Sequence, residues 1–298
     1  MYKVKPISYS TLWGDDRLKQ YGANIEAPIG IVYSVSGIEA FNCEIENEQE
    51  HTTLKEKVEQ NPECFGLLKG EEFPVIIAFD ACKESVSFQI HPRDDYAKQK
   101  LNLPYGKSEA WFFIQAPTHH FVWAKHNGNI KNALETNTME DIINHLPVKE
   151  HDLVYLQSGV VHALTKGSLI YEIQQSTNIT YRLYDYNRID PKTNKPRQLN
   201  IDEALDNIDS NINPVCISFE EGKQDFREFS LHHTTLKQTF TNESNIVCAI
   251  SVLKNKAIIN HETITQGHSI LVLPKETITI QNEADVMIAY ISDYFRHS

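Results

Sequence analysis

Short stretches in which apolar and polar residues alternate recur along most of the chain. In residues 86–91, apolar side chains alternate one by one with polar ones. The apolar residues are Val86, Phe88 and Ile90, and the polar residues are Ser87, Gln89 and His91. Strict alternation is typical of a half-buried strand, because successive side chains of a strand point to opposite faces. The same reasoning predicts strands at 86–91, 109–115, 153–156, 169–175, 180–186, 246–253, 270–273, 278–281 and 286–292.

Helical spacing is rarer. Leu54 and Val58 lie four residues apart and predict a helix over 52–60. A second helix is expected over 138–146, where apolar residues form one stripe after Thr138, a residue type favoured at helix N-termini. A third is expected over 202–208.

Many short strands separated by turns, with few helices, indicate a mainly β protein built as a sandwich or barrel. The length of 298 residues suggests about two domains. A polar, charged stretch at 222–227 is a plausible boundary. We therefore expect a first domain over 1–225, with the candidate site residues, and a smaller β domain over 226–298.

The composition and net charge exclude some classes of binding partner. Hydrophobic residues make up 41% of the chain, enough for a packed core, and the net charge is −12. Nucleic acids and anionic membranes attract basic surfaces, so neither is expected as a partner. No apolar run is long enough to span a membrane, the first residues lack the apolar core of a signal peptide, and the five cysteines form no CxxC motif. We expect a cytoplasmic protein with reduced thiols.

Four side chains that could bind a metal ion lie on these predicted strands or next to them. Gln89 and His91 are two residues apart and share a strand face, Glu109 shares a face with Trp111, and His162 lies among apolar residues. Each alone could be a polar residue satisfied by its neighbours. Together they form a mixed nitrogen and oxygen ligand set that suits zinc or a similar divalent ion.

A further polar group follows on the strands at 169–175 and 180–186. Glu172 and Gln174 share one strand face, and Arg182 shares a face with Thr180 and Tyr184. An arginine on a strand is usually a surface residue, but a fixed cation can also stabilise a developing oxyanion. Typical nucleotide-binding and lipase motifs are missing from the sequence.

At these positions the sequence resembles the short bacterial form of the type I mannose-6-phosphate isomerases. The resemblance takes in Leu12-Trp13-Gly14 and covers about residues 1–210. Four family motifs occur in order. They are a metal strand similar to LS-x-Q-x-HP-x-DEYA at 86–97, GKTE-x-W at 106–111, SGT-x-HA-[IL] at 158–164, and QQ-x-SD-x-TYR-x-YD-[YW]-x-R at 174–188.

The resemblance implies a cupin, that is, a jelly-roll or double-stranded β-helix, which holds one zinc ion and converts mannose 6-phosphate to fructose 6-phosphate reversibly. The implied zinc ligands are Gln89, His91, Glu109 and His162. Arg182 matches the family's active-site arginine, and Lys107 and Glu172 match positions lining the site. Ser87 matches a serine near the substrate phosphate.

This chemistry suits the residues. An aldose–ketose isomerisation moves a proton between adjacent carbons through an enediol. It needs a base, a group that polarises the carbonyl, and positive charge near the enediolate. Zinc could polarise the sugar oxygens, Arg182 could stabilise the anion, Lys107 could hold the phosphate, and Glu172 is a candidate base.

Three positions depart from the family pattern. Ile31 and Tyr33 stand where the family usually has Glu and Trp, and Ala78 stands where it has Lys. A second reading is therefore a cupin that keeps the metal site but acts on another sugar or sugar phosphate. A third is a sugar-binding or regulatory protein with little isomerase activity. The sequence leaves the oligomeric state, the physiological metal and the pathway open.

Overall fold

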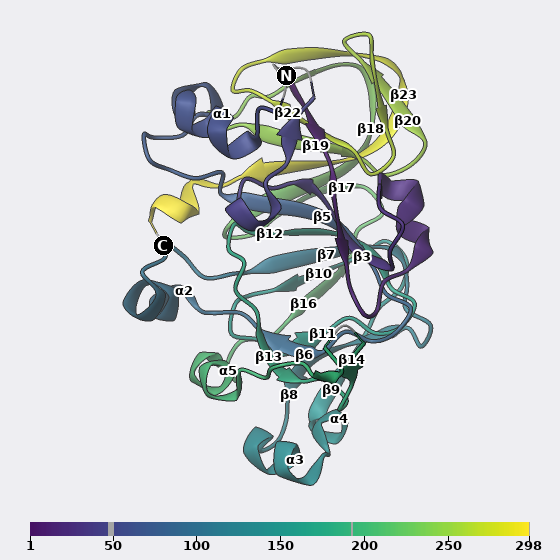
Figure 1. The fold of residues 1–298 in the computed structure, drawn as a ribbon. Coiled ribbons are helices and arrows are strands. Elements are labelled where there is room, and N and C mark those ends of the chain that lie inside the picture. Colours follow the sequence, from purple (N-terminus) through teal and green to yellow (C-terminus); the bar gives the residue numbers. More distant parts are fainter. Residues whose placement is uncertain (47–50, 192, 298) are drawn as a thin grey trace.

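The computed structural model describes residues 1–46, 51–191 and 193–297. Within these ranges the chain forms three β-sheets stacked as layers, together with a small hairpin and short helices, so it is mainly β as expected (Figure 1). In the view of Figure 1 the sheets lie at the top, middle and bottom of the molecule. Every helix in the described ranges is too short or too polar to span a lipid bilayer.

The middle sheet has the strand order β16-β10-β7-β12-β5-β3-β2. The bounds of these strands are β16 (Val215–Ser218), β10 (Asp152–Leu156), β7 (Glu109–Gln115), β12 (Leu169–Gln175), β5 (Val75–Ala81), β3 (Ile29–Val35) and β2 (Ile7–Ser10). All seven residues of β5 and all seven of β12 are buried. Both faces of this sheet are covered, which is why β5 is a nearly continuous apolar run and why the polar side chains of β12 are buried as well.

The lower sheet packs against one face of the middle sheet. Its strands, in order, are β13 (Tyr181–Tyr184), β6 (Phe88–Ile90), β11 (His162–Ala163), β8 (Phe121–His126) and β9 (Ile143–Pro147). Trp111 and Phe113 from the middle sheet share one apolar cluster with Val122 and Ala124 from the lower sheet. The expected alternation of β7 therefore holds, with odd-numbered residues facing the lower sheet.

The upper sheet covers the other face of the middle sheet. It contains β17 (Gly222–Asp225), β18 (Phe229–Thr241), β23 (Thr277–Ile291), β19 (Cys248–Val252), β22 (Ser269–Val272), β1 (Tyr2–Lys5) and β4 (Glu44–Ile45), with β20 (Lys256–Ile259) and β21 (Glu262–Thr265) attached. Phe112 of β7 belongs to the same apolar cluster as Leu231 and Met287 of this sheet. The upper sheet thus joins strands from both ends of the chain.

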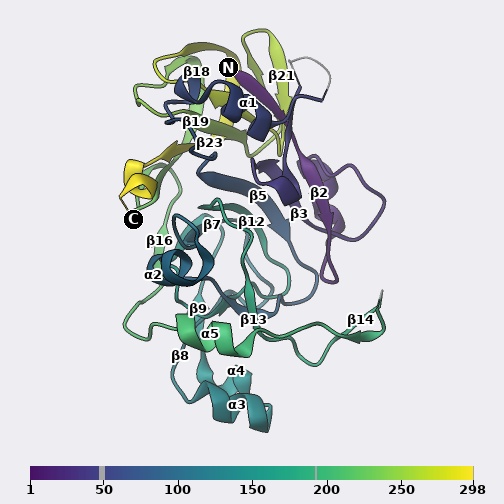
Figure 2. The same cartoon turned by 60° about the vertical axis from the view of Figure 1, so that its left-hand side comes forward.

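Helices and single turns lie at the edges of the layers. The α-helices are α1 (Leu54–Gln60), α2 (Asp94–Tyr96), α3 (Ile130–Thr136), α4 (Met139–Ile142) and α5 (Ile201–Asn207). The 3-10 and π turns are η1 (Asp16–Tyr21), η2 (Glu39–Phe41), η3 (Pro62–Phe65), η4 (Ala97–Leu101) and η5 (Asp293–Arg296). Figure 2 shows the hairpin of β14 (Ile189–Asp190) and β15 (Lys195–Pro196) extending away from the layers.

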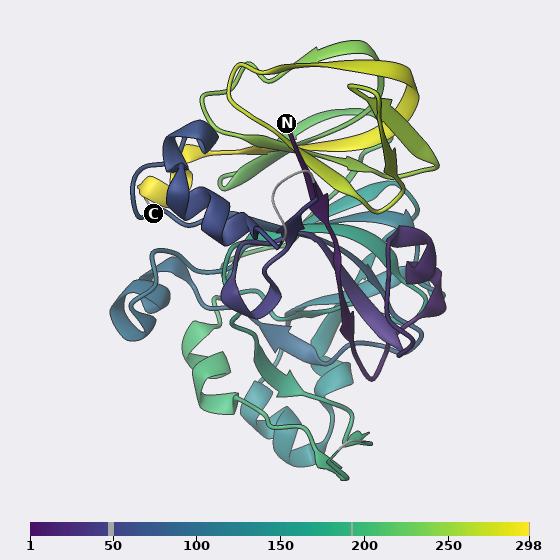
Figure 3. The same ribbon diagram turned by 45° about the horizontal axis from the view of Figure 1, so that its top comes forward.

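The C-terminal turn η5 returns to the N-terminal half of the chain, close to the segment that follows α1 (Figure 3). The Arg296 guanidinium donates to the Glu71 carboxylate at 2.8 Å and to the Gly66 carbonyl at 2.8 Å. These contacts tie the end of the upper sheet to the loop that leads into β5.

The helix expected over 138–146 is wrong beyond residue 142. Residues 139–142 are helical, but Ile143–Pro147 forms β9 and pairs with β8. The His145 ring stacks on Phe121 at a centroid distance of 4.0 Å. Pairing and ring packing along the edge of the lower sheet outweigh the apolar stripe, which local spacing alone cannot reveal. Helix α3 was not expected, and the strands expected at 278–281 and 286–292 are one continuous strand, β23.

Candidate active site

Three polar side chains from different strands lie in one row on the lower sheet. Gln89 of β6 is paired directly with His162 of β11 on one side and with Arg182 of β13 on the other. Directly paired residues of neighbouring strands project from the same face. The row therefore points at the middle sheet, and Gln89 Nε2 lies 3.4 Å from His162 Nε2.

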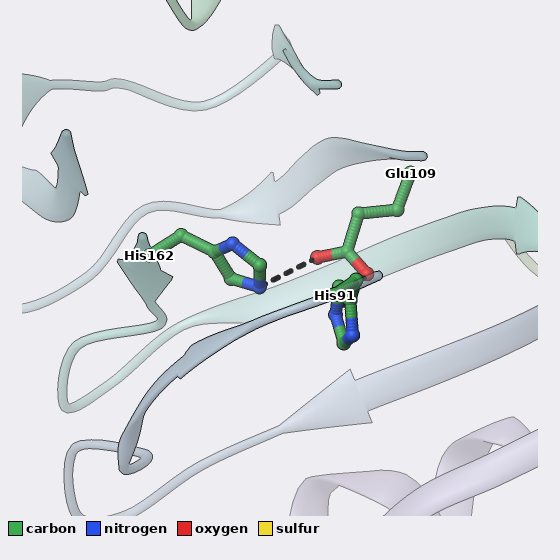
Figure 4. Close-up of side chains that lie close together, drawn as sticks. All are labelled: His91, Glu109 and His162. Carbon is green, nitrogen blue, oxygen red and sulfur yellow. Dashed lines mark ion pairs between the residues drawn. The ribbon is translucent and has the colours of Figure 1, made fainter. Parts of the chain in front are cut away.

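Glu109, the first residue of β7, meets two histidines between the sheets (Figure 4). Its Oε2 atom lies 3.0 Å from His91 Nε2, and its Oε1 atom lies 3.3 Å from His162 Nε2. All three side chains are buried, with 1–2% of each exposed. His91 follows β6 directly, so both sheets contribute to this cluster.

The tautomers of the two histidines follow from their outer contacts. His91 Nδ1 lies 3.0 Å from the Ile179 carbonyl oxygen, and His162 Nδ1 lies 2.8 Å from the Val160 carbonyl oxygen. A carbonyl only accepts, so each Nδ1 carries the proton and each Nε2 presents a lone pair to Glu109. This outer hydrogen bonding is the arrangement that orients metal-ligating histidines.

The electrostatics of the cluster favour neutral histidines and an ionised carboxylate. Burial, with the Lys107 cation, lowers the pKa of His91 to about 4, and burial also lowers the pKa of His162. Burial on its own raises the pKa of Glu109, but the adjacent His91, His162 and Lys107 outweigh it and leave the pKa below its usual range. Lone pairs on nitrogen and oxygen therefore face one another in a dry site.

These residues fit a divalent metal ion. The ligand atoms of His91, Glu109 and His162 lie within 4.8 Å of one another, and His91 Nε2 and both Glu109 oxygens have no hydrogen-bond partner among the described residues. Enclosed lone pairs without a donor are costly unless a cation binds between them. Rotation of the Gln89 amide would bring its oxygen toward the same point, giving the two-nitrogen, two-oxygen set expected from the sequence.

Lys107 and Glu172 lie at an inner cavity beside this cluster. The cavity has a volume of about 110 Å³, and Gln89, Lys107, Trp111 and Glu172 are among its lining residues. Lys107 Nζ is 3.6 Å from Glu109 Oε2, and the Trp111 indole donates to Glu172 at 2.9 Å. Burial, together with the negative charge of Glu109, raises the pKa of Glu172 to about 7.

Arg182 and Ser87 line a larger outer cleft of about 760 Å³. Gln89, Tyr33 and Thr180 line both spaces, so the cleft and the inner cavity adjoin each other. The Arg182 guanidinium donates to the Gln198 carbonyl at 3.0 Å, while its Nε finds no partner among the described residues. The structure thus separates Arg182 and Ser87 from Lys107, which lies at the inner end.

Two more arginines of the outer cleft were given no role from the sequence. Arg188 and Arg197 both pair with Asp185, with Arg188 Nε at 3.0 Å and Arg197 Nε at 2.7 Å from its oxygens. Together with Arg182 they give the outer cleft three guanidinium groups, two of which pair with Asp185. Arg188 ends the last quoted motif and could have been noticed there, whereas Arg197 comes close only because the chain turns back after the β14–β15 hairpin.

The three departures from the family pattern lie together on one face of the middle sheet, where Ile31 and Tyr33 line the inner cavity and Ala78 stands beside them. Tyr33 of β3 is paired with Ala78 of β5, which is paired with Glu172 of β12, while Ile31 is paired with Asp80. These side chains share one face of the middle sheet, and residues 31 and 78 are diagonal neighbours on adjacent strands. Asp80, which the sequence reasoning passed over, lines the inner cavity with Ile31, Tyr33 and Glu172.

Comparison with known proteins places this arrangement in a family. Mannose-6-phosphate isomerase ManA of Bacillus subtilis (strain 168) is 31% identical over 211 residues, which cover 69% of this chain and 67% of that protein. The chain belongs to the type I mannose-6-phosphate isomerase family. The mannose-6-phosphate isomerase of Streptococcus mutans is 29% identical over 71% of this chain and 70% of that protein. No protein-family model matches the chain.

The fold comparison agrees with the family. The crystal structure of the mannose 6-phosphate isomerase from Bacillus subtilis superposes with a TM-score of 0.84 and 22% identity, over 97% of this chain and 99% of that one. The expected cupin fold of the mannose-6-phosphate isomerase family is therefore confirmed.

Proposed function

We propose that the protein interconverts mannose 6-phosphate and fructose 6-phosphate through an enediol, with one zinc ion held by Gln89, His91, Glu109 and His162. The observation that carries this proposal is the buried group of ligand atoms at His91, Glu109 and His162, in which His91 Nε2 and both Glu109 oxygens have no hydrogen-bond partner among the described residues. The group lies at the edge of a cavity in a chain of this family. A bound zinc ion would supply a Lewis acid that polarises or orients the sugar oxygens.

The two adjoining spaces suggest how a sugar phosphate would lie. The inner cavity is small, about 110 Å³, and has room for only one end of the substrate. We propose that the reacting carbons lie there and that the phosphate lies in the outer cleft, close to Ser87 and Arg182. Arginine is well suited to phosphate because its planar guanidinium can donate two parallel hydrogen bonds. Arg188 and Arg197 add to the positive charge at this end.

Glu172 is the group we propose for proton transfer. Its carboxylate would take the proton from C2 of mannose 6-phosphate and return it to C1 of the enediol, while a hydroxyl proton passes from the C2 oxygen to the C1 oxygen. The product is fructose 6-phosphate, with no net gain or loss of protons. A pKa of about 7 suits a general base that must both accept and release a proton near neutral pH. Lys107, beside Glu109 in the inner cavity, would stabilise the negative charge on the enediolate oxygens.

The changed cavity wall favours a second candidate. Ile31 and Ala78 stand where the family pattern has two charged residues, on the sheet face that borders the inner cavity. The chain could therefore keep the metal and act on another sugar or sugar phosphate. A sugar-binding or regulatory protein with little turnover fits the same observation. We expect either protein to be cytoplasmic, in keeping with five free cysteines and no disulfide.

The test is a coupled assay with mannose 6-phosphate on protein stripped with a chelator and then reloaded with zinc. We expect turnover to vanish on stripping and to return with about one zinc per chain. The His91→Ala and His162→Ala variants should fold but fail to hold zinc. If both variants retain stoichiometric zinc, the ligand set is wrong. Zinc-loaded wild-type protein that binds sugar phosphates without turnover would favour the binding protein, and turnover of another sugar in a substrate panel would favour the related isomerase.

A further inference from the structure

Asp80 is a charged residue on an otherwise apolar strand. Every residue of β5 is buried, and only 6% of Asp80 is exposed. Its Oδ1 atom is enclosed and has no hydrogen-bond partner among the described residues. An enclosed polar atom without a partner is costly, so it needs either a bound group or a functional reason.

The side chain faces the inner cavity. Asp80 is paired with Ile31 on β3 and Ile170 on β12, and Ala78 of the same strand is paired with Glu172. Residues two apart on a strand share a face, so Asp80 and Glu172 stand diagonally on the same wall. Asp80 lines the cavity together with Gln89, Lys107 and Glu172.

One oxygen of Asp80 is engaged with its neighbour. The carboxyl groups of Asp80 and Glu172 lie within hydrogen-bonding reach, while the other side of Glu172 accepts from the Trp111 indole. Burial, followed by the negative charges of Glu172 and Glu109, raises the pKa of Asp80 well above its ordinary value. A carboxyl pair of this kind is stable when one proton lies between its oxygens, and the pair then still has oxygen lone pairs that can accept a hydrogen bond.

We propose that Asp80 is a substrate-binding residue whose carboxyl group accepts a hydrogen bond from one hydroxyl group of the sugar in the inner cavity. Apolar side chains also line the cavity, among them Val86 and Ile31, the strand partner of Asp80. A sugar offers both hydroxyl groups and C–H faces, so such a wall and such an acceptor together select one orientation. A site that accepts a hydrogen bond from a substrate hydroxyl group discriminates strongly against an analogue that lacks this hydroxyl group. The inference rests on the proposed function only for the class of ligand, a sugar phosphate.

The experiment compares three substitutions in zinc-loaded protein. Asp80→Ala and Asp80→Leu remove the acceptor. Asp80→Asn keeps one carbonyl oxygen and offers an N–H group to Glu172, so it should rescue binding. Asp152→Asn is the matched control, because Asp152 is also 6% exposed but lies on β10 outside both spaces. Melting temperature and zinc content of each variant are measured alongside binding.

Binding is measured by calorimetry with mannose 6-phosphate, fructose 6-phosphate and a series of deoxy-sugar phosphates that each lack one hydroxyl group. We expect Asp80→Ala and Asp80→Leu to bind mannose 6-phosphate at least tenfold more weakly, and Asp80→Asn and the control within about threefold of wild type. One deoxy compound should bind weakly to wild-type protein but as well as its parent sugar to Asp80→Ala.

Two results would overturn the role of Asp80. One is unchanged binding in Asp80→Ala, and the other is a deoxy series whose losses are the same in wild type and Asp80→Ala. Because the readout is binding, the outcome is separate from catalysis. If wild-type protein binds the sugars but does not isomerise them, the proposed reaction is wrong. The deoxy series then still tests the role of Asp80. Wild-type protein that binds none of the sugars overturns both.

Discussion

At the scale of single residues, Arg182 is placed where it can act on a ligand without supporting the fold. It lies in a row with Gln89 and His162, lines the outer cleft, and makes one side-chain hydrogen bond to the Gln198 carbonyl. Burial, followed by repulsion from Arg197, lowers the pKa of its guanidinium. Burial and neighbouring cations both disfavour the charged guanidinium, and an anion bound beside it would offset that cost.

We therefore expect Arg182→Ala to lower kcat/KM for mannose 6-phosphate by about 10- to 100-fold, the cost of losing a charge-assisted hydrogen bond to the phosphate. Melting temperature and zinc content should stay near wild type. Arg93→Ala serves as the control, because Arg93 pairs with the exposed Asp95 away from both spaces. A large loss of stability with unchanged turnover per folded molecule would make Arg182 a structural residue.

Ile31 and Ala78 are better understood as one change than as two. Because they are diagonal neighbours on one face, the Glu and Lys of the family pattern at these positions would stand beside each other. Replacing both with apolar residues leaves the net charge of the wall unchanged. A lysine restored at 78 alone would meet Asp80 and Glu172 in the middle sheet, at the inner end of the site and away from Arg182.

This pairing predicts non-additive substitutions. Ala78→Lys alone should reduce kcat, because an ammonium group beside Glu172 holds that carboxylate ionised and lowers its basicity. The double variant Ile31→Glu, Ala78→Lys should be destabilised less than the sum of the losses in the two single variants. The difference, a coupling in the free energy of unfolding, should be about 0.5–3 kcal/mol. Denaturant unfolding of the four proteins measures it. Additive effects, or a tenfold gain in mannose 6-phosphate affinity from Ala78→Lys alone, would contradict the paired interpretation.

At the scale of elements, α1 has local signals strong enough to fix its start. Thr53 accepts from the Glu56 backbone N–H, and the Glu56 side chain accepts from the Thr53 backbone N–H at 2.9 Å, which is a complete capping box. Leu54 and Val58 are buried against the core. The helix lies in the N-terminal half and contributes no residue to either cavity.

Thr53→Ala should therefore destabilise the protein by about 0.5–2 kcal/mol, the usual cost of losing an N-cap side chain. Turnover per folded molecule should not change. Unfolding in urea gives the free energy, and Thr263→Ala on the exposed face of β21 is the comparison. An unchanged midpoint for Thr53→Ala would mean that water replaces the cap without loss.

At the scale of the whole molecule, one histidine sits between the upper and middle sheets. The His233 ring on β18 lies 4.9 Å from the Phe112 ring on β7 and 2.9 Å from Asp285 on β23. Burial lowers the pKa of His233, but the hydrogen bond and charge of Asp285 outweigh it and leave the pKa above its ordinary value of 6.5. The charged form of His233 is thus favoured in the folded protein.

The sign of the pH effect follows from this shift. Because the pKa of His233 is higher in the folded than in the unfolded protein, this residue adds to the free energy of unfolding. The contribution is complete below the unfolded-state pKa near 6.5 and disappears as the pH rises through the folded-state pKa. We expect His233→Gln and Asp285→Asn to flatten the melting-temperature profile in this range. His232→Gln is the control, because burial lowers the pKa of His232 and its contribution has the opposite slope. A profile unchanged by both His233→Gln and Asp285→Asn would rule out this linkage.

The sequence by itself determined the faces of the strands. The period of two in 109–115 places Glu109, Trp111 and Phe113 on one face, and the structure has all three toward the lower sheet. Alternation is a local property of extended backbone, so it survives whatever the strand pairs with. The mainly β class followed from the same signal, and the family followed from motifs whose residues are close in sequence.

Only the tertiary structure decided which faces meet. His91, Glu109 and His162 come from two sheets and become a group because the sheets pack face to face, and Asp80 gains a role because β5 lies beside β12 in the middle layer. The same long-range pairing turned residues 143–147 into β9 against their helical stripe and brought Arg197 to the outer cleft. Register and layer order depend on contacts far apart in the chain, where local spacing carries no information.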